Sequence, residues 1–462
     1  MNRVVFLGIL LFATTINVSM AQNDTVSLNL REARQFALEN NRDLLNAKED
    51  IAVSEAEYKA TRAEGLPQVD GTVDYTTNFN YEVEFDPSAG EKTSTPDIDP
   101  TLLDEGDREV LNAIQQMMAP SEPATILMED QMNARVRVSQ LIFSGQYWVG
   151  LETAKIAKEL AKKQVDQTEL EVKKQITNIY YLILISEKSL EILNENIANL
   201  KNVLEHTRNM ARTGLVEETD VDQIRMSLSK LKNNRASTKR NIRVNYKMLK
   251  IQMGLDRNKN IVIRDSLSSV MDKTEDDLLV KNLELNNNPS FQLLESQEQM
   301  KEKQVDLKKW AYAPNLTGYY SYTEKIMTTG FDLSPNNAAG FTLSVPIFSS
   351  GSRKAKVNKA KIELDKTRRN KEKLEDQLKL QEDQLKYELK SALENYQTQK
   401  KNVKVAERVY NNTHNKYSQG LVSSMDLTQA NNNYLEAKSN YVSSVLKLLQ
   451  AKLNLEELYG TL

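Results

Sequence analysis

Strict alternation of polar and apolar side chains marks one stretch near the N-terminus. From Gln68 to Phe85 every even-numbered position is polar, and the odd-numbered positions are apolar except for Gly71 and Thr77. A period of two is typical of a strand that has one apolar face and one polar face. The sequence therefore predicts a strand over residues 68–85.

The same period recurs in three other segments, at 134–142, 315–323 and 341–347. Two interpretations fit the four segments: a half-buried sheet of a soluble domain, or strands of an outer-membrane barrel with apolar side chains toward lipid and polar ones toward the lumen. Four strands cannot close a barrel, and open strand edges are not tolerated in lipid. The membrane interpretation therefore requires several chains, a dimer or a trimer, to share one barrel.

Helical periodicity fills most of the remaining chain. Helices are predicted at 27–63, 148–212, 217–253, 275–312, 352–418 and 424–458. One heptad row of the sixty-seven-residue stretch at 352–418 consists of Leu378, Leu385, Ala392 and Ala406. A second row consists of Leu389, Tyr396, Val403, Tyr410 and Tyr417. Such rows predict coiled-coil packing, and a helix of 65 residues is about 100 Å long at 1.5 Å per residue.

The chain also repeats itself. Thr213-Gly214-Leu215-Val216 corresponds to Gln419-Gly420-Leu421-Val422, and Asp220 corresponds to Asp426, at an offset of about 206 residues. Upstream matches such as Pro67 with Pro314 have an offset of 247, so the first copy carries an insertion. The sequence predicts a duplicated unit: a first repeat at 22–254, a linker at 255–274 and a second repeat at 275–462. The insertion at 82–132 is acidic and is interpreted as a solvated loop with a short helix near 103–118.

Composition narrows the function. The 462 residues include 61 basic and 64 acidic side chains, giving a net charge of −3, and there is no cysteine. Thiolate metal sites and cysteine nucleophiles are thereby excluded, and the near-neutral charge argues against a nucleic-acid partner. His206 and His414 are the only histidines, and neither has clustered ligands around it. The sequence therefore predicts a protein that is not an enzyme and that has no catalytic site, cofactor or metal.

The first 21 residues have the pattern of a signal peptide. Arg3 precedes the apolar run Val4–Ala13, and Ser19-Met20-Ala21 fits a cleavage site after Ala21. The apolar run is about half the length that a membrane-spanning helix needs. The sequence thus predicts an exported protein.

Several ordered motifs resemble the TolC family of outer membrane efflux proteins. They are Leu28-Asn29-Leu30-Arg31-Glu32-Ala33, Ala37-Leu38-Glu39-Asn40-Asn41, Gly65-Leu66-Pro67, the Ile-Phe-Ser-Gly segment at 142–145 and the two Gly-Leu-Val turns that are followed by aspartate. The resemblance extends from about residue 27 to residue 460, through both repeats.

This resemblance implies a fold and a role. The fold is mainly α with β: a homotrimer in which each chain gives four strands to a 12-stranded barrel in the outer membrane of a Gram-negative bacterium. The barrel continues into a long helical barrel in the periplasm. The implied function is a passive exit duct for small molecules, with a periplasmic adaptor protein and an inner-membrane transporter. Two alternatives stay open: the same channel in type I protein secretion, and an exported coiled-coil scaffold without a pore.

The resemblance also implies two groups of site residues. Gly214, Leu215, Gly420 and Leu421 correspond to the tip that contacts the adaptor, although glycine there also fits a plain helix C-cap.

Thr219, Asp220, Tyr417 and Asp426 correspond to a periplasmic gate. The two aspartates also fit charge compensation at a helix N-terminus, and Tyr417 also fits a heptad core position. In a trimer each aspartate forms a ring of three carboxylates, which should attract cations. The sequence departs from the family pattern at Val422 and Gln429, where some members have an arginine and a second aspartate.

Overall fold

The computed structural model describes residues 25–79, 81–85, 100–117, 124–127, 129–256, 258–271, 276–327 and 334–462. The expected signal peptide, residues 1–21, and much of the acidic insertion lie outside the described residues.

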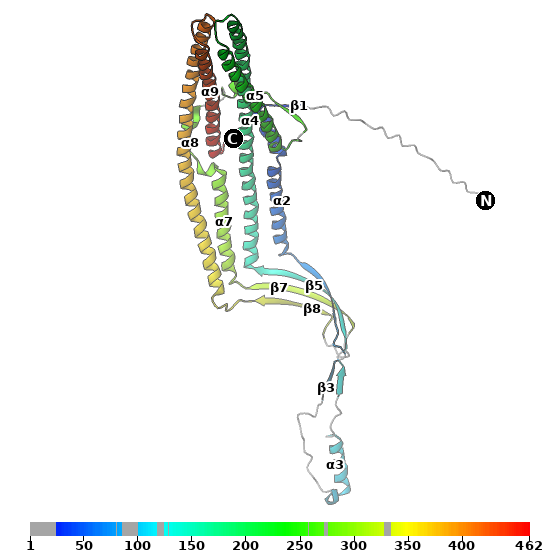
Figure 1. Ribbon diagram of the computed structural model, residues 1–462. Helices are drawn as coiled ribbons and strands as arrows, with labels where there is room; N and C mark the ends of the chain where they lie inside the picture. Colours follow the sequence, from blue (N-terminus) through cyan, green and yellow to red (C-terminus); the bar gives the residue numbers. More distant parts are fainter. Residues whose placement is uncertain are drawn as a thin grey trace, which may run out of the picture. The chain divides into compact units, whose positions relative to one another are not determined.

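Helices form most of the described chain (Figure 1). Their bounds are α1 (Leu30–Asn40), α2 (Arg42–Ala63), α3 (Glu105–Met117), α4 (Gly145–Arg212), α5 (Glu218–Gln252), α6 (Leu267–Met271), α7 (Pro289–Trp310), α8 (Ser352–Ser418) and α9 (Ser424–Leu458). Short 3-10 turns lie at η1 (Pro100–Leu102), η2 (Asp276–Leu279) and η3 (Leu285–Asn287). The two long helices and the two return helices thus form where the sequence predicts them, and so does the short helix of the insertion.

The chain divides into two compact units. One consists of Met1–Glu57, Thr153–Glu302 and Ala360–Leu462, and the other of Tyr58–Glu152 and Lys303–Lys359. The first is helical apart from a small parallel pair of strands, β1 (Thr25–Leu28) and β6 (Asn260–Ile263). This division cuts across both repeats, so the repeat boundaries at 22–254, 255–274 and 275–462 stay a prediction from sequence.

Four helices pack around one apolar cluster in the helical unit. The cluster joins α4, α5, α8 and α9, which run side by side in Figure 1, through residues such as Leu200, Ile224, Tyr410 and Leu427. The predicted heptad positions of α8 are buried at Leu378, Leu385, Leu389, Tyr410 and Tyr417. Burial of these side chains supplies the free energy that an isolated charged helix lacks.

Two buried asparagines repeat one connection in both halves. The Asn41 side chain donates to the Gln252 carbonyl at 2.7 Å and accepts from the Leu44 amide at 3.0 Å. Asn288 donates to the Leu458 carbonyl at 3.0 Å and accepts from the Phe291 amide. Each asparagine therefore caps the start of one helix and holds the last residue of a return helix. We call this pair, Asn41 and Asn288, the asparagine clasp.

The second unit contains a four-stranded antiparallel sheet in the order β2–β5–β7–β8. Its strands are β2 (Gln68–Thr76), β5 (Gln131–Ser144), β7 (Asn315–Met327) and β8 (Asn337–Ser344). The strand pair of the first repeat thus adjoins that of the second, as β5 pairs with β7 from Met132 to Ser144. Among the described residues, β2 and β8 each pair with one neighbour only, so both edges of the sheet are open there.

The register separates polar from apolar side chains as the alternation predicts. Directly opposite residues lie on the same face of an antiparallel pair. Asp70, Arg137 and Ser321 therefore share one face, whereas Val69, Val138 and Tyr320 share the other. The sheet has a polar face and an apolar face, and the apolar one is largely exposed in the single chain.

The single strand expected over 68–85 is wrong. Two strands form there, because the chain turns at Phe79, which has a left-handed φ of 50°. Asp130 stabilises the turn, since its carboxylate accepts from the Tyr75 hydroxyl at 2.7 Å and from the Asn78 amide at 3.3 Å. β3 (Glu82–Phe85) instead pairs with β4 (Ala124–Leu127) in a separate ribbon.

Two helix starts also differ from the expected 27 and 275. Residues 25–28 are a strand, and Asn29 caps α1 by accepting from the Glu32 amide. The helix expected over 27–63 is divided at Asn41, whose extended backbone ends α1. The helix expected from 275 begins at Pro289, after two 3-10 turns, because Asn288 caps it there.

Among the helices that the structure describes, none is both long enough and apolar enough to cross a bilayer.

Candidate tip and gate

Two equivalent turns connect the long helices to their return helices. The Leu215 amide donates to the Met210 carbonyl at 3.0 Å, and the Leu421 amide donates to the Lys416 carbonyl at 2.9 Å. These are six-to-one bonds of the Schellman type, which require a left-handed residue just past the helix. Gly214 and Gly420 supply it with φ values of 73° and 74°.

The leucine of each turn is exposed. Leu215 is 71% exposed and Leu421 is 68% exposed, although both are large apolar side chains. Apart from the adjoining residues, no described atom lies within 4 Å of the Cβ position at either glycine, so space alone does not require glycine there. All four residues expected at the tip thus lie on two matching turns, each of which exposes one apolar side chain.

The two gate aspartates begin the return helices as capping residues. Asp220 accepts from the Glu217 amide at 3.1 Å. Asp426 accepts from the Ser423 amide at 3.0 Å and from the Ser423 hydroxyl at 2.7 Å. These bonds from Ser423 lower the pKa of Asp426 from its ordinary value. Both aspartates therefore have a local role at a helix start, in addition to any role in a pore.

Asp220 makes one contact that Asp426 lacks. The Ser424 hydroxyl, from the first residue of α9, donates to the second oxygen of the Asp220 carboxylate. This bond joins the starts of α5 and α9. Thr219 is exposed and donates to Glu217 at 3.0 Å, within its own turn.

Tyr417 is a core residue that also has a polar partner. Its side chain is 2% exposed, and its hydroxyl lies 2.6 Å from the Thr207 hydroxyl oxygen. Thr207 uses its own proton for the Val203 carbonyl at 2.8 Å, so Tyr417 donates to Thr207. Burial raises the pKa of Tyr417 above its ordinary value. This bond holds α8 to α4.

The two departures from the family pattern carry no ion pair in the structure. Val422 packs against the apolar cluster of the four helices, and Gln429 donates to Asn433 at 2.8 Å.

Sequence reasoning missed Thr207 and Ser424, the partners of Tyr417 and Asp220. Neither residue has a local signal, because each partnership joins segments more than 200 residues apart.

The histidines take part in ring packing. His206 lies 6.2 Å from the Tyr417 ring and His414 lies 6.0 Å from the Tyr410 ring, measured between centroids. Within the described ranges, no group of three or more histidine or acidic residues could hold a metal ion.

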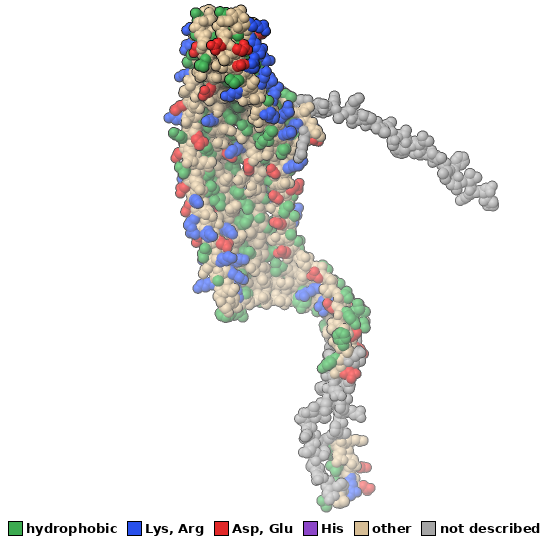
Figure 2. Space-filling model, viewed as in Figure 1, with side chains coloured by type: hydrophobic (Ala, Val, Ile, Leu, Met, Phe, Trp, Pro, Cys, Tyr) green, Lys and Arg blue, Asp and Glu red, His purple; other side chains and the backbone are tan. Residues whose placement is uncertain are grey.

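Basic side chains follow α5. In the space-filling view they gather on the part of the surface that α5 occupies (Figure 2). They are Arg225, Lys230, Lys232, Arg235, Lys239, Arg240, Arg243, Lys247 and Lys250. The return helix of the first repeat is therefore strongly positive, whereas its first turn is acidic.

Solved structures with the same fold are outer-membrane channels. CusC superposes with a TM-score of 0.72 at 14% identity, covering 94% of this chain and 93% of CusC. CmeC of Campylobacter jejuni has a TM-score of 0.71 at 17% identity, and the match covers 94% of this chain and 86% of CmeC. VceC of Vibrio cholerae has a TM-score of 0.70 at 14% identity, and the match covers 93% of this chain and 96% of VceC. The fold class, a mainly helical chain with a few strands, is therefore that of the TolC-like channels.

Sequence comparison points to the same family. Residues 280–461 match the family model described as Outer membrane efflux protein, so this part of the chain is similar in sequence to that family. No curated protein matches the chain. The expected resemblance is thus confirmed by sequence over residues 280–461 and by fold over nearly the whole chain. The family consists of transport channels, not enzymes.

Proposed function

We propose that the chain forms a homotrimeric exit duct in the outer membrane of a Gram-negative bacterium. In this proposal the duct is passive and exports small molecules that an inner-membrane transporter and a periplasmic adaptor protein deliver. The observation that carries the proposal is the four-stranded sheet, which has one apolar face, one polar face and two open edges.

The apolar face supports contact with lipid. Val69, Val73, Phe341 and Leu343 are all more than 60% exposed in the single chain. A contiguous apolar surface of this kind is unfavourable in water and favourable against acyl chains. The polar face, turned inward, can line a pore.

The open edges support a trimer. An edge strand in lipid must pair, because its backbone groups find no water there. Pairing β2 of one chain with β8 of the next leaves no edge when the ring closes. Three chains of four strands make 12, an even number as in other outer-membrane barrels, and large enough to enclose a passage.

The two turns support docking of a partner at the tip. We assign Gly214, Leu215, Gly420 and Leu421 to adaptor contact, since each leucine is an exposed apolar side chain on a rigid turn. An adaptor that covers both leucines gains the free energy of burying them.

The contacts of Asp220 and Tyr417 support a gate that is closed at rest. Each contact holds one helix of the first repeat to one of the second. The Tyr417 bond joins the two long helices and the Asp220 bond joins the starts of the two return helices, so an opening that separates either pair breaks its bond. An adaptor that binds the open arrangement better shifts the equilibrium toward it. We include Thr219 and Asp426 in the gate as polar residues of the same turns.

The decisive experiment is the native mass of the mature protein extracted from outer membranes in mild detergent, corrected for bound detergent. The proposal expects three chains, and conductance after reconstitution into a planar bilayer. A monomer that is soluble without detergent contradicts it and favours the exported coiled-coil scaffold. Protein secretion needs the same pore, so cargo is decided separately, by deleting the gene and measuring drug susceptibility and secreted protein.

A further inference from the structure

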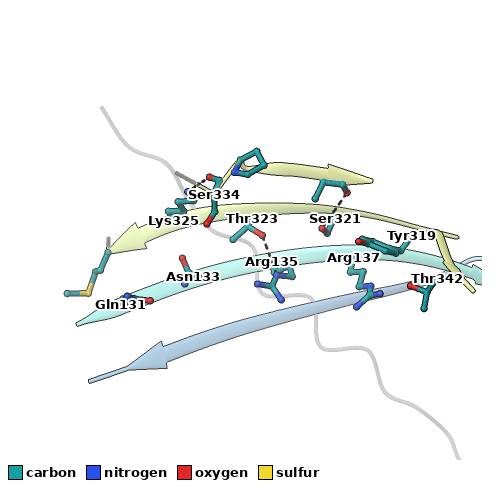
Figure 3. A pocket seen from close by; sticks show the side chains of 13 residues that line it. Gln131, Asn133, Arg135, Arg137, Tyr319, Ser321, Thr323, Lys325, Ser334 and Thr342 are labelled. Atoms are coloured by element: carbon teal, nitrogen blue, oxygen red, sulfur yellow. Dashed lines mark hydrogen bonds between the residues drawn. The ribbon is translucent and has the colours of Figure 1, made fainter. Parts of the chain in front are cut away.

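The polar face of the sheet is hollowed beside β5. A concavity of about 700 Å³ lies against β5, β7, β8 and the segment at 334–335 (Figure 3). Arg135 and Arg137 point into it from β5, and Tyr319, Ser321 and Lys325 do so from β7. All of these residues belong to one compact unit.

The concavity is lined by positive charge. Arg135 and Arg137 belong to its lining, and the described residues that line it include no aspartate or glutamate. Residues two apart on a strand share a face, so the two arginines stand next to each other. Two like charges side by side on a sheet lower its stability. Neutral polar side chains would make the face equally hydrophilic, so hydrophilicity alone does not explain the two arginines.

Both guanidinium groups are held by neutral partners. Arg137 lies over the Tyr319 ring at 4.6 Å from its centroid, and the Arg135 Nε donates to the Thr323 hydroxyl at 3.3 Å. A guanidinium has five N–H donors, so each arginine keeps donors for another acceptor. Ring stacking and one side-chain bond fix the two groups without neutralising them.

The carboxylates of the same face belong to β2. Asp70 lies opposite Arg137 in the register and Asp74 lies opposite Asn133. Among the described residues, neither aspartate forms an ion pair with either arginine. The described residues that line the concavity come from β5, β7, β8 and the segment at 334–335, and none comes from β2. The described lining therefore carries no carboxylate, although Asp70 faces Arg137 across the strand pair.

We propose that Arg135 and Arg137 form a binding site for the anionic group, carboxylate, sulfonate or phosphate, of small organic solutes that pass along this face. The inference rests on the proposed channel function and adds a substrate class to it. Paired guanidinium forks match such oxyanions in geometry as well as in charge. In a trimer the site occurs three times around the passage, as basic rings do in anion pores.

The test uses the purified full-length protein in neutral detergent with 8-hydroxypyrene-1,3,6-trisulfonate as the probe anion. Binding is followed by fluorescence anisotropy at physiological salt. The proposal expects saturable binding by the wild-type protein and a loss of affinity of about tenfold or more in the R135Q/R137Q variant. The R135K/R137K variant keeps the positive charge but lacks the guanidinium forks. Its affinity for the probe should therefore lie between that of the wild type and that of the R135Q/R137Q variant.

The matched control removes two arginines from the basic helix. The R240Q/R243Q variant loses the same charge from α5 and should bind the probe like the wild type. The proposal would be overturned by any of three results. They are an equal loss of probe affinity in both glutamine variants, no probe binding by the wild-type protein, and full probe affinity in the lysine variant. If the R135Q/R137Q variant does not assemble, the lysine variant decides.

The outcome is separate from that of the channel test. A trimer that conducts but does not bind the probe removes the anion site and leaves the channel. Probe binding by a protein that is not a trimer removes the channel and leaves a basic site on a sheet.

Discussion

The two turns that end the long helices have the same backbone and different side-chain partners. Gly214 and Gly420 adopt nearly the same φ, and the leucines that follow are exposed to the same extent. The first return helix begins with Glu217-Glu218, however, whereas the second begins with Ser423-Ser424. Only the second pair offers hydroxyl donors.

This difference explains why the two aspartates differ. Asp426 accepts both of its bonds from Ser423 of its own turn through one carboxylate oxygen, whereas Asp220 accepts from Glu217 through one oxygen and from Ser424 of the other repeat through the second. A reciprocal contact of Asp426 with Glu218 would bring two carboxylates together. The two turns thus share one backbone conformation, and the difference at their polar positions makes one aspartate a link between α5 and α9.

The asparagine clasp is the opposite case. Asn41 and Asn288 are buried, and each makes the same two kinds of hydrogen bond. A buried amide that loses its partner is costly, so both copies keep the residue. Comparing the clasp with the turns suggests that burial preserves symmetry between the repeats and exposure permits divergence.

The largest effect on stability is expected at the clasp. Replacing either Asn41 or Asn288 by Ala leaves a helix-end carbonyl and a helix-start amide without their partner. Each change should cost about 1–3 kcal/mol. Thermal unfolding of the purified protein measures the loss of stability in each variant. Clearly unequal losses in the two variants would contradict the equivalence of Asn41 and Asn288 that we infer.

A smaller and unequal effect is expected at the aspartates. Asp220→Ala removes a cap and a link between helices, and Asp426→Ala removes a cap alone, so the first should lower the melting temperature more. If both line the gate, each also reduces cation preference, measured as the reversal potential in a salt gradient. Unchanged selectivity in the double variant rejects the acidic ring.

The pH dependence of the Asp426 cap follows from its lowered pKa. Its stabilising contribution is complete above about pH 4, the ordinary range of an aspartate, and is lost as the pH falls through the lowered value. Comparing wild type with the Asp426→Ala variant across pH 2–6 isolates this contribution. A difference in melting temperature that persists at the lowest pH contradicts it.

The smallest effect on stability is expected at Leu215 and Leu421. Changing both to Ser should alter the free energy of unfolding by within about 0.5 kcal/mol, because the side chains are exposed. Efflux in cells should nevertheless fall, since the proposed adaptor contact is lost. An unchanged melting temperature and trimer with unchanged drug susceptibility would remove the leucines from the adaptor surface.

Much of the fold could be predicted because the chain repeats its local signals. Alternation identified β2, β5, β7 and β8 and their two faces, and Arg135 and Arg137 already belonged to the polar row. The heptad rows gave five buried positions of α8, but not the buried Ala360 and Leu364 near its start. These features depend on residues two to seven positions apart, which periodicity detects.

The remainder depends on contacts between distant segments. β1 and β6 are four residues each and pair across more than 200 positions. The turn at Phe79 depends on Asp130, and the Asp220 link depends on Ser424. The asparagines of the clasp were visible as similar sequences in the two repeats, but which backbone groups they hold was not. The concavity beside the arginines required the curvature of a sheet built from both repeats.

The open strands β2 and β8 also bear on how the protein matures. Until neighbours arrive, a lone chain carries two unpaired edges and an exposed apolar face, the combination that promotes aggregation. The helical unit has buried apolar clusters of its own, whereas in the proposed trimer the sheet is covered only by lipid and sister chains. Biogenesis should therefore depend on a chaperone that binds the newly exported chain. A shortage of that chaperone should yield aggregates in which the chains associate through the sheet.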